Sequence, residues 1–159
     1  MKTKNLLFTL SIILMSIDSL SQRYNIKGKW LTEEEDAIIK IFKENDGSFS
    51  GEIYWMKFPN DENGNPKTDP LNKDKSLRSR NRKGMIIMNN FIYNSNLKWI
   101  DGEIYDPKNG KTYSGTINMV SENLLELRGY VGITWFGRTS QWSRIEEPNE
   151  RDEDNGSSG

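Results

Sequence analysis

Between residues 24 and 145 the chain alternates short apolar runs with polar turns, and no stretch keeps the period of an amphipathic helix. The runs are rich in Ile, Tyr, Trp and Thr, which favour strands, and Asn, Asp and Gly separate them. The pattern therefore predicts an all-β fold. The predicted strands are Gly28–Leu31, Asp36–Lys43, Ser48–Met56, Gly84–Met88, Phe91–Asn94, Leu97–Trp99 continuing to Glu103–Asp106, Lys111–Met119, Leu124–Val131 and Gly137–Ile145.

Two of the turns predict how these strands pair. Asn45-Asp46-Gly47 and Lys108-Asn109-Gly110 both end in glycine, as tight hairpins that need a positive φ often do. The flanking strands should therefore be antiparallel neighbours. Every strand carries large apolar residues on one face, and a closed sheet buries that face without leaving an exposed edge. We expect an antiparallel up-and-down β-barrel of eight to nine strands rather than a sandwich.

One long loop interrupts the predicted strands. Residues 57–83 form a run of 27 residues with almost no apolar side chain, and a loop of this length in a compact domain is usually functional or mobile. Six bases fall within eleven of its residues, opposed by one acid, Asp74. This cluster predicts either a clamp for an anionic ligand or a solvated basic surface. The bases are Lys73, Lys75, Arg78, Arg80, Arg82 and Lys83.

The two ends of the chain differ from this middle. Lys2 and Lys4 precede the apolar stretch Leu6–Ile17, which is too short to cross a bilayer, and Ser19 and Ser21 suit signal peptidase. Residues 1–21 are therefore predicted to be a signal peptide cleaved near Ser21, with an uncleaved membrane anchor as the alternative. Residues 146–159 hold six acids and no residue that could join a core, which predicts a disordered acidic tail. The folded domain is expected over residues 22–145, periplasmic or extracellular.

Composition removes several classes of chemistry. The 159 residues include no Cys and no His, which excludes disulfides, thiolate zinc sites, Ser-His-Asp hydrolysis and haem held by a proximal His. No cofactor is predicted. The formal charge of −1 hides a mildly basic domain, since residues 22–145 hold 19 Lys and Arg against 16 Asp and Glu. That excess is small for a nucleic-acid binder, so nucleic acid is not an expected partner.

Oxygen ligands in the long loop do not follow the spacing of a calcium loop. Ca²⁺ binds arrays of Asp and Asn, but Pro66 stands where an EF-hand loop needs Gly, and no Glu occupies its twelfth position. No metal site is therefore predicted. The oxygen-bearing residues are Asp61, Asn63, Asn65, Asp69, Asn72 and Asp74.

A hairpin and a glycine-flanked segment hold further candidates. In Tyr105–Tyr113 a carboxylate, a Lys and two Tyr meet around a turn, which predicts either a binding rim or residues that serve the turn itself. Gly129–Gly137 is apolar and aromatic, which predicts either a flap at the barrel mouth or core packing. The candidate ligand-binding residues are Asp69, Asn72, Arg78, Arg80, Tyr105, Asp106, Lys111, Tyr113, Arg128 and Trp135.

The first and last predicted strands carry a matching signature. Gly28-Lys29-Trp30 opens the first strand, and Trp142 and Arg144 lie in the last. This resembles the lipocalin-like calycin superfamily, in which the Trp of a G-x-W motif packs beneath a basic side chain of the final strand. The alternative is a core Trp beside a snorkelling Arg. The resemblance implies a structural role for Gly28, Trp30, Arg138, Trp142 and Arg144, with Arg144 or Arg138 stacked on Trp30.

A longer order of motifs resembles one bacterial family. The motifs are Gly28-x-Trp30, Asp46-Gly47-x-x-x-Gly51-x-Ile53, Asp69-Pro70-x-Asn72-x-Asp74-x-x-Leu77-Arg78-x-Arg80-x-x-x-Gly84, Gly102-x-Ile104-Tyr105-Asp106-Pro107-x-x-Gly110-Lys111-x-Tyr113, Leu127-Arg128-Gly129 and Gly137-Arg138-x-x-x-Trp142-x-Arg144. Over about residues 26–145 they resemble the exported family of domain of unknown function 2147. The resemblance implies a small secreted or periplasmic calycin-like barrel and no particular activity. Residues 80–83 depart from the proline-containing turn that the family tends to hold there.

The predicted function is that of a non-enzymatic exported barrel that binds a small amphipathic or anionic ligand at the cell envelope. One alternative is an enzyme that acts on glycans through Asp69, Glu103 and Asp106. Another is a protein-interaction module that uses the 57–83 loop and Trp135–Phe136. An open apolar cavity of about 300 Å³ or more would favour a ligand-binding function. A filled barrel interior would favour the interaction module, and two carboxylates that converge in a cleft would favour an enzyme.

Overall fold

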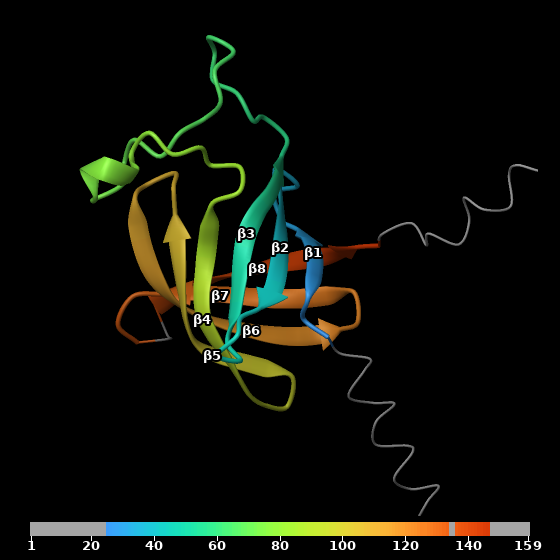
Figure 1. Ribbon diagram of the computed structural model, residues 1–159. Coiled ribbons are helices and arrows are strands. Elements are labelled where there is room, and N and C mark those ends of the chain that lie inside the picture. The colour runs from blue at the N-terminus through green and yellow to red at the C-terminus, as the bar shows by residue number, and fades with distance from the viewer. Residues whose placement is uncertain (1–24, 134–135, 147–159) are drawn as a thin grey trace, which may run out of the picture.

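The computed structural model describes residues 25–133 and 136–146 (Figure 1). Each strand pairs antiparallel with the next and β8 returns to β1, so the eight strands of these residues form a closed up-and-down barrel. The predicted fold is confirmed. The elements are β1 (Gly28–Leu31), β2 (Ala37–Lys43), β3 (Phe49–Met56), the 3₁₀ helix η1 (Lys75–Leu77), β4 (Ile86–Ser95), β5 (Lys98–Asp106), β6 (Lys111–Ser121), β7 (Leu124–Tyr130) and β8 (Gly137–Ile145).

The predicted signal peptide, Trp135 and residues 147–159 of the predicted tail lie outside the described residues. Within residues 25–133 and 136–146, no helix has the length and apolar character needed to cross a membrane.

Both predicted hairpins form where the turn residues place them. Gly47 and Gly110 have φ of 92° and 70°, a region that glycine adopts without steric cost, and they join β2 to β3 and β5 to β6. Residues 86–88 and 91–94, which were predicted in two separate strands, instead belong to one strand, β4, and Gly84 and Met85 precede it. Asn90 has φ of 60° where the register between β3 and β4 shifts. A bulge of this kind bends a strand without removing it from the sheet.

One end of the barrel, here called the base, is filled by side chains. The base carries the connections 44–48, 96–97 and 122–123. Phe91 is fully buried there, and Gly102 and Gly115 leave room for its ring. A Cβ at Gly102 would lie 2.4 Å from the Phe91 ring atoms, so no larger residue fits without moving the ring. The Trp99 ring packs edge-on against Phe49 at 6.1 Å.

The calycin-like signature closes this base. Trp30 is fully buried and donates from Nε1 to the carbonyl of Ile26 at 2.9 Å. The Arg144 guanidinium lies 4.2 Å from the Trp30 ring centroid and donates to three carbonyls, those of Asn25, Lys27 and Glu122. Arg144 is therefore the stacking partner. Arg138 lies instead at the opposite end of β8, where it contacts Glu33 and Glu34.

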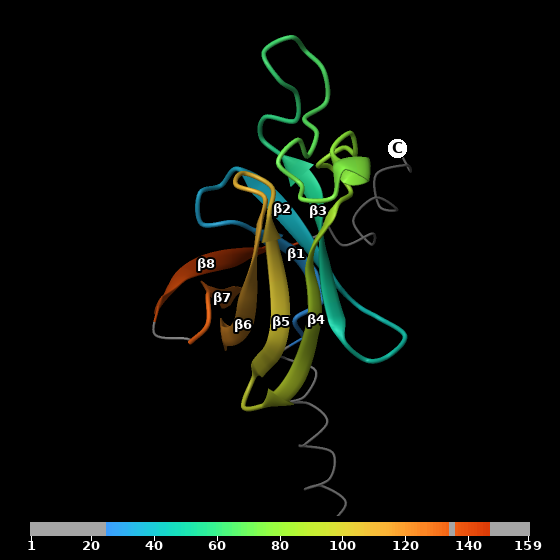
Figure 2. The ribbon, with the colours of Figure 1, turned by 90° about the vertical axis from the view of Figure 1, so that its left-hand side faces the viewer.

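The other end, here called the mouth, carries the connections 32–36, 57–85, 107–110 and 131–136. The long β3–β4 connection rises above the barrel in both ribbon views (Figures 1 and 2). It is more ordered than a structureless loop, because isolated β-bridges join Asn60 to Pro66 and Thr68 to Asn81, and η1 forms a further turn. The connection therefore has a defined shape above one side of the mouth.

Candidate functional site

The barrel encloses a cavity of about 560 Å³ that opens at the mouth. Its floor consists of buried side chains from four strands, among them Ile39, Ile53, Leu127 and Trp142. Ile39 and Ile53 are direct cross-strand partners, so the inward-facing positions of β2 and β3 supply one apolar wall. A volume above 300 Å³ with apolar walls is typical of small-molecule sites. The cavity therefore meets the size expected of a binder, and the part of the barrel interior next to the mouth is not filled.

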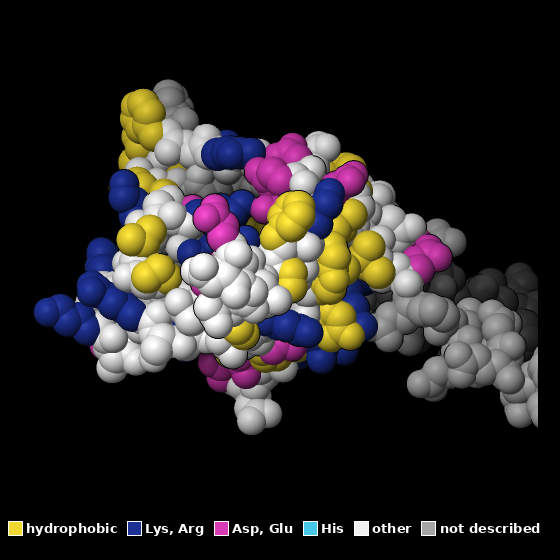
Figure 3. All heavy atoms as spheres, turned by 90° about the horizontal axis from the view of Figure 1, so that it is seen from above, with side chains coloured by type: hydrophobic (Ala, Val, Ile, Leu, Met, Phe, Trp, Pro, Cys, Tyr) yellow, Lys and Arg dark blue, Asp and Glu magenta, His cyan; other side chains and the backbone are white. Residues whose placement is uncertain are grey.

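The mouth of the cavity carries charged side chains, which the floor lacks. Seen from above, hydrophobic side chains lie among acidic and basic ones (Figure 3). The charged residues of the lining all come from the mouth connections or the strand ends next to them. They are Glu34, Asp36, Arg82, Asp106, Lys108 and Arg138.

Two ion pairs hold the β1–β2 connection at the mouth. Lys108 Nζ lies 2.8 Å from Asp36 Oδ2, and Arg138 Nη2 lies 2.9 Å from Glu34 Oε1. The hydrogen bond to Asp36 raises the pKa of Lys108. Burial acts to raise the pKa of Asp36, but the hydrogen bond and charge of Lys108, together with hydrogen bonds from Thr32 and the backbone, lower that pKa overall. Both side chains therefore stay charged at neutral pH.

A buried carboxylate, Asp69, fastens the long connection to the barrel. Tyr105 on β5 donates from its hydroxyl to Oδ1 at 2.6 Å. Asn72 Nδ2 donates to Oδ2 at 2.7 Å, and Arg80 donates to the same oxygen from Nε and Nη2 at 3.1 and 3.0 Å. Burial acts to raise the pKa of Asp69, but these donors together lower it. The predicted residues Asp69, Asn72, Arg80 and Tyr105 thus meet in one network.

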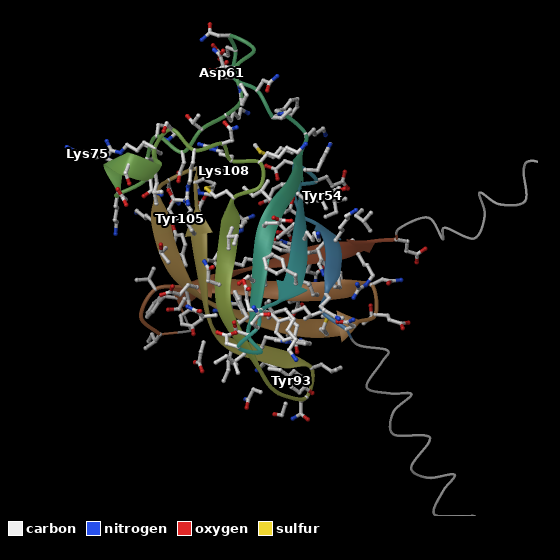
Figure 4. The ribbon with its side chains drawn as sticks, in the orientation of Figure 1. Tyr54, Asp61, Lys75, Tyr93, Tyr105 and Lys108 are labelled. Atoms are coloured by element: carbon white, nitrogen blue, oxygen red, sulfur yellow. The ribbon has the colours of Figure 1, made fainter. Side chains whose placement is uncertain are left out.

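The other two arginines of the basic cluster also donate within or beneath the loop. Arg78 Nε donates to the Asn72 carbonyl at 2.8 Å. Arg82 donates from Nε to the Thr68 carbonyl at 2.7 Å and from Nη2 to the Pro107 carbonyl at 3.0 Å. The bond to Pro107 joins the loop to the β5–β6 turn, and the other two bonds lie within the loop. The three lysines of the cluster, Lys73, Lys75 and Lys83, are exposed, and Lys75 projects outward from η1 in Figure 4.

The remaining predicted residues divide between the cavity and the outer surface. Asp106 accepts from the backbone N–H of Lys108 and from Asn109 Nδ2, and Tyr113 Oη accepts from Asn109 Nδ2, so these side chains serve the turn while they line the cavity. Lys111 and Arg128 do not line it, and Arg128 donates to Thr139. Among the candidates that the structure describes, Tyr105, Asp106 and Tyr113 are therefore the ones that reach the cavity.

The sequence did not indicate that four charged residues lie together at the mouth of the cavity. They are Glu34, Asp36, Lys108 and Arg138. Asp36 and Lys108 are 72 residues apart, and Glu34 and Arg138 are 104 apart. No local pattern links residues at such distances. Only closure of the barrel brings them together.

Comparison with known proteins places the chain in a family. The model of the family described as an uncharacterized protein conserved in bacteria, DUF2147, matches residues 28–144. The chain belongs to the DUF2147 family. A solved structure with a TM-score of 0.67 and 25% sequence identity is that of protein HP1028 from the human pathogen Helicobacter pylori, described as belonging to the lipocalin family. The match covers 82% of this chain and 88% of that one. A search of curated proteins finds no match.

The three carboxylates considered for glycan chemistry have three different surroundings in this DUF2147 barrel. Asp69 is enclosed by donors beneath the loop, Glu103 is exposed and does not line the cavity, and Asp106 lies in its own turn at the mouth. Asp61, in the oxygen-rich series, accepts from the backbone N–H groups of Asn63 and Asn65 and so forms a turn. Across the described residues no group of three acidic side chains could hold a metal ion.

Proposed function

We propose that this DUF2147 protein is a non-enzymatic binder of a small amphipathic or anionic molecule, which it holds in the barrel cavity. The observation that carries the proposal is the cavity of about 560 Å³ with an apolar floor and a charged mouth. Sites of this size take ligands of drug-like dimensions, and apolar walls with a few polar groups are their usual composition. The kinship with a lipocalin-family structure supports the same role.

The apolar floor and the charged mouth of the cavity together favour an amphipathic ligand. An apolar chain or ring would displace water from Ile39, Ile53 and Leu127, which gains about 0.8 kcal/mol for each buried CH₂ group. A polar head would remain at the mouth, beside the bases Arg82, Lys108 and Arg138 and the acids that accompany them. An anionic head would meet charge-assisted donors there.

Displacement of a fluorescent probe tests this proposal. We expect 1-anilinonaphthalene-8-sulfonate to gain fluorescence on binding and dodecanoate to displace it with a Kd on the order of micromolar. Ala37→Trp places an indole in the cavity that Ala37 lines, and should abolish both effects. The matched control is Val120→Trp, at an exposed position of β6 outside the lining, which should leave both unchanged.

The outcomes are distinct. Equal binding by wild type and Ala37→Trp, with the variant folded by circular dichroism, would show that the probe lies outside the barrel and would overturn the proposal. Absence of displacement by dodecanoate, by dodecyltrimethylammonium and by dodecylphosphocholine would overturn it as well.

We further propose that the protein acts at the cell envelope after export. Support comes from the basic start, the short apolar stretch Leu6–Ile17 and the small residues at 19 and 21. We expect the protein in the envelope or secreted fraction of its host. Its intact mass should correspond to a chain that begins at Gln22. Recovery of the unprocessed chain from the cytoplasm would contradict this setting.

A further inference from the structure

The bases that line the cavity mouth already donate to acceptors of the protein. Lys108 Nζ lies 2.8 Å from Asp36 Oδ2. Arg138 Nη2 lies 2.9 Å from Glu34 Oε1, and Arg82 donates to two backbone carbonyls. Within the part of the chain that the structure describes, the lining holds three acids and three bases. A ligand head that reaches Lys108 or Arg138 therefore meets a carboxylate at the same place.

The acids and the bases of these two ion pairs come from different elements. Glu34 and Asp36 both belong to the β1–β2 connection, 32–36, whereas Lys108 lies in the β5–β6 turn and Arg138 in β8. The hydroxyl of Thr32 donates to the second carboxylate oxygen of Asp36 at 3.1 Å, which holds this carboxylate in place. Negative charge is thus gathered on one connection, and positive charge lies on the two elements that this connection contacts.

Lys108 lies in a negative surrounding. The hydrogen bond to Asp36 is the largest effect that raises the pKa of Lys108, and the charges of Asp36, Glu34 and Asp106 raise it further, although burial acts to lower it. A carboxylate or phosphate that approaches Lys108 alone is repelled by these acids. An ammonium group that approaches Asp36 alone competes with Lys108 in the same way. A head with one charge of either sign therefore matches the mouth poorly.

We propose, given that the cavity binds an amphipathic molecule as proposed above, that the mouth selects molecules with a zwitterionic head, in which an ammonium and an anionic group lie a few bonds apart. The ammonium replaces Lys108 as the partner of Asp36, and the anionic group replaces Asp36 as the partner of Lys108. One ion pair within the protein is thus exchanged for two between protein and ligand, and no charge loses its partner. A head with one charge leaves one side chain of the pair without a partner. Glu34 and Arg138 offer the same exchange.

Isothermal titration calorimetry at pH 7 with four dodecyl compounds tests this selection, each compound being kept below the concentration at which it forms micelles. The four share one apolar chain and differ in the head: N-dodecyl-N,N-dimethylglycine is zwitterionic, dodecanoate anionic, dodecyltrimethylammonium cationic and dodecyl maltoside uncharged. We expect the dimethylglycine compound to bind roughly fivefold tighter than each of the others, the contribution of one further, partly exposed ion pair. Ala37→Trp, which blocks the cavity, should bind none of the four.

Removal of one charge from the Asp36–Lys108 pair should change the preferred head. Lys108→Met leaves Asp36 without its base, so dodecyltrimethylammonium should become the tightest ligand. Asp36→Asn leaves Lys108 without its acid, so dodecanoate should become the tightest ligand. Dodecyl maltoside should bind both variants as it binds wild type. The matched controls Lys98→Met and Asp101→Asn remove exposed charges of β5 outside the cavity lining, and should keep the wild-type order of affinities.

Failure of the head selection and failure of cavity binding are distinguishable. If folded wild type binds none of the four compounds, cavity binding itself is overturned, and the selection with it. If wild type binds all four equally, or binds dodecanoate, dodecyltrimethylammonium or dodecyl maltoside most tightly, the cavity remains a binding site and the selection of a zwitterionic head is overturned. An order of affinities that stays the same in Lys108→Met and Asp36→Asn would overturn the role of this ion pair.

Discussion

The hydroxyl of Tyr105 donates a 2.6 Å hydrogen bond to the fully buried carboxylate of Asp69, across 36 residues of sequence. Tyr105 also lines the cavity, so one side chain contacts both the ligand space and the residue that fastens the long connection. The order of the mouth therefore depends on a polar contact as well as on the barrel strands. Its removal should loosen the loop before it unfolds the barrel.

Asp69→Asn should lower the free energy of unfolding by about 2–3 kcal/mol, because Arg80 and Tyr105 lose an ionised acceptor. Tyr105→Phe should lower it by about 1–2 kcal/mol. Urea unfolding of the two single variants and the double variant measures their coupling. Hydrogen exchange should quicken over residues 67–82 more than in β6 and β7. Strictly additive effects would show that the bond does not hold the loop.

Acid should remove the contribution of Asp69 to the free energy of unfolding. Its pKa is lowered in the folded protein, so the unfolded chain takes up the proton first as the pH falls. The stabilisation is therefore complete above about pH 4, near the ordinary pKa of Asp, and is lost as the pH falls through the lowered folded-state pKa. The stability difference between wild type and Asp69→Asn should stay constant from pH 7 to pH 5 and shrink below pH 4. A difference that grows on acidification would contradict this sign.

Gly102→Ala should destabilise the barrel by about 1–3 kcal/mol through overpacking, since the new methyl group would collide with the Phe91 ring. Gly129→Ala is the matched control, because a Cβ there meets its nearest atom at an ordinary 3.6 Å. Thermal unfolding should show a much smaller change for the control. Phe91→Leu in the Gly102→Ala background should restore part of the loss if the collision is its cause.

Arg144→Met should cost about 2–3 kcal/mol, because it removes the stacking on Trp30 and leaves three carbonyls without their donor. Arg138→Met removes an exposed pair with Glu33 and Glu34 and should cost less than about 1 kcal/mol. Denaturant midpoints measure both changes. Equal costs would mean that the base is not closed by Arg144.

The fold could be predicted to a large extent because its signals are local. Alternating apolar residues, the Asp-Gly and Asn-Gly turns and the Gly28-x-Trp30 motif indicate strands, hairpins and a calycin-like closure, and these are confirmed. The division of β4 into two strands was wrong because a bulge at Asn90 cannot be told from a turn by composition. The choice between Arg144 and Arg138 needed the direction of β8 relative to Trp30.

The candidate site could be predicted only in part. Tyr105, Asp106 and Tyr113 were found because they cluster around one hairpin, and they do line the cavity. The arginines of the long connection were recognised as a cluster, but the structure directs Nε of Arg78, Arg80 and Arg82 to acceptors within the loop. A cluster of bases in the sequence indicates positive charge but does not show which acceptors the side chains reach.

The sequence by itself determined the all-β fold class and which strands form hairpins, because both depend on neighbouring residues. It also determined which kinds of chemistry the chain lacks, because that follows from residue counts. Tertiary structure decided which end of the barrel is filled and which is open. Phe91 packs against Gly102 at the base, whereas the inward side chains near the mouth leave about 560 Å³ unfilled. Packing of this kind joins residues from distant strands, so only the closed barrel fixes it.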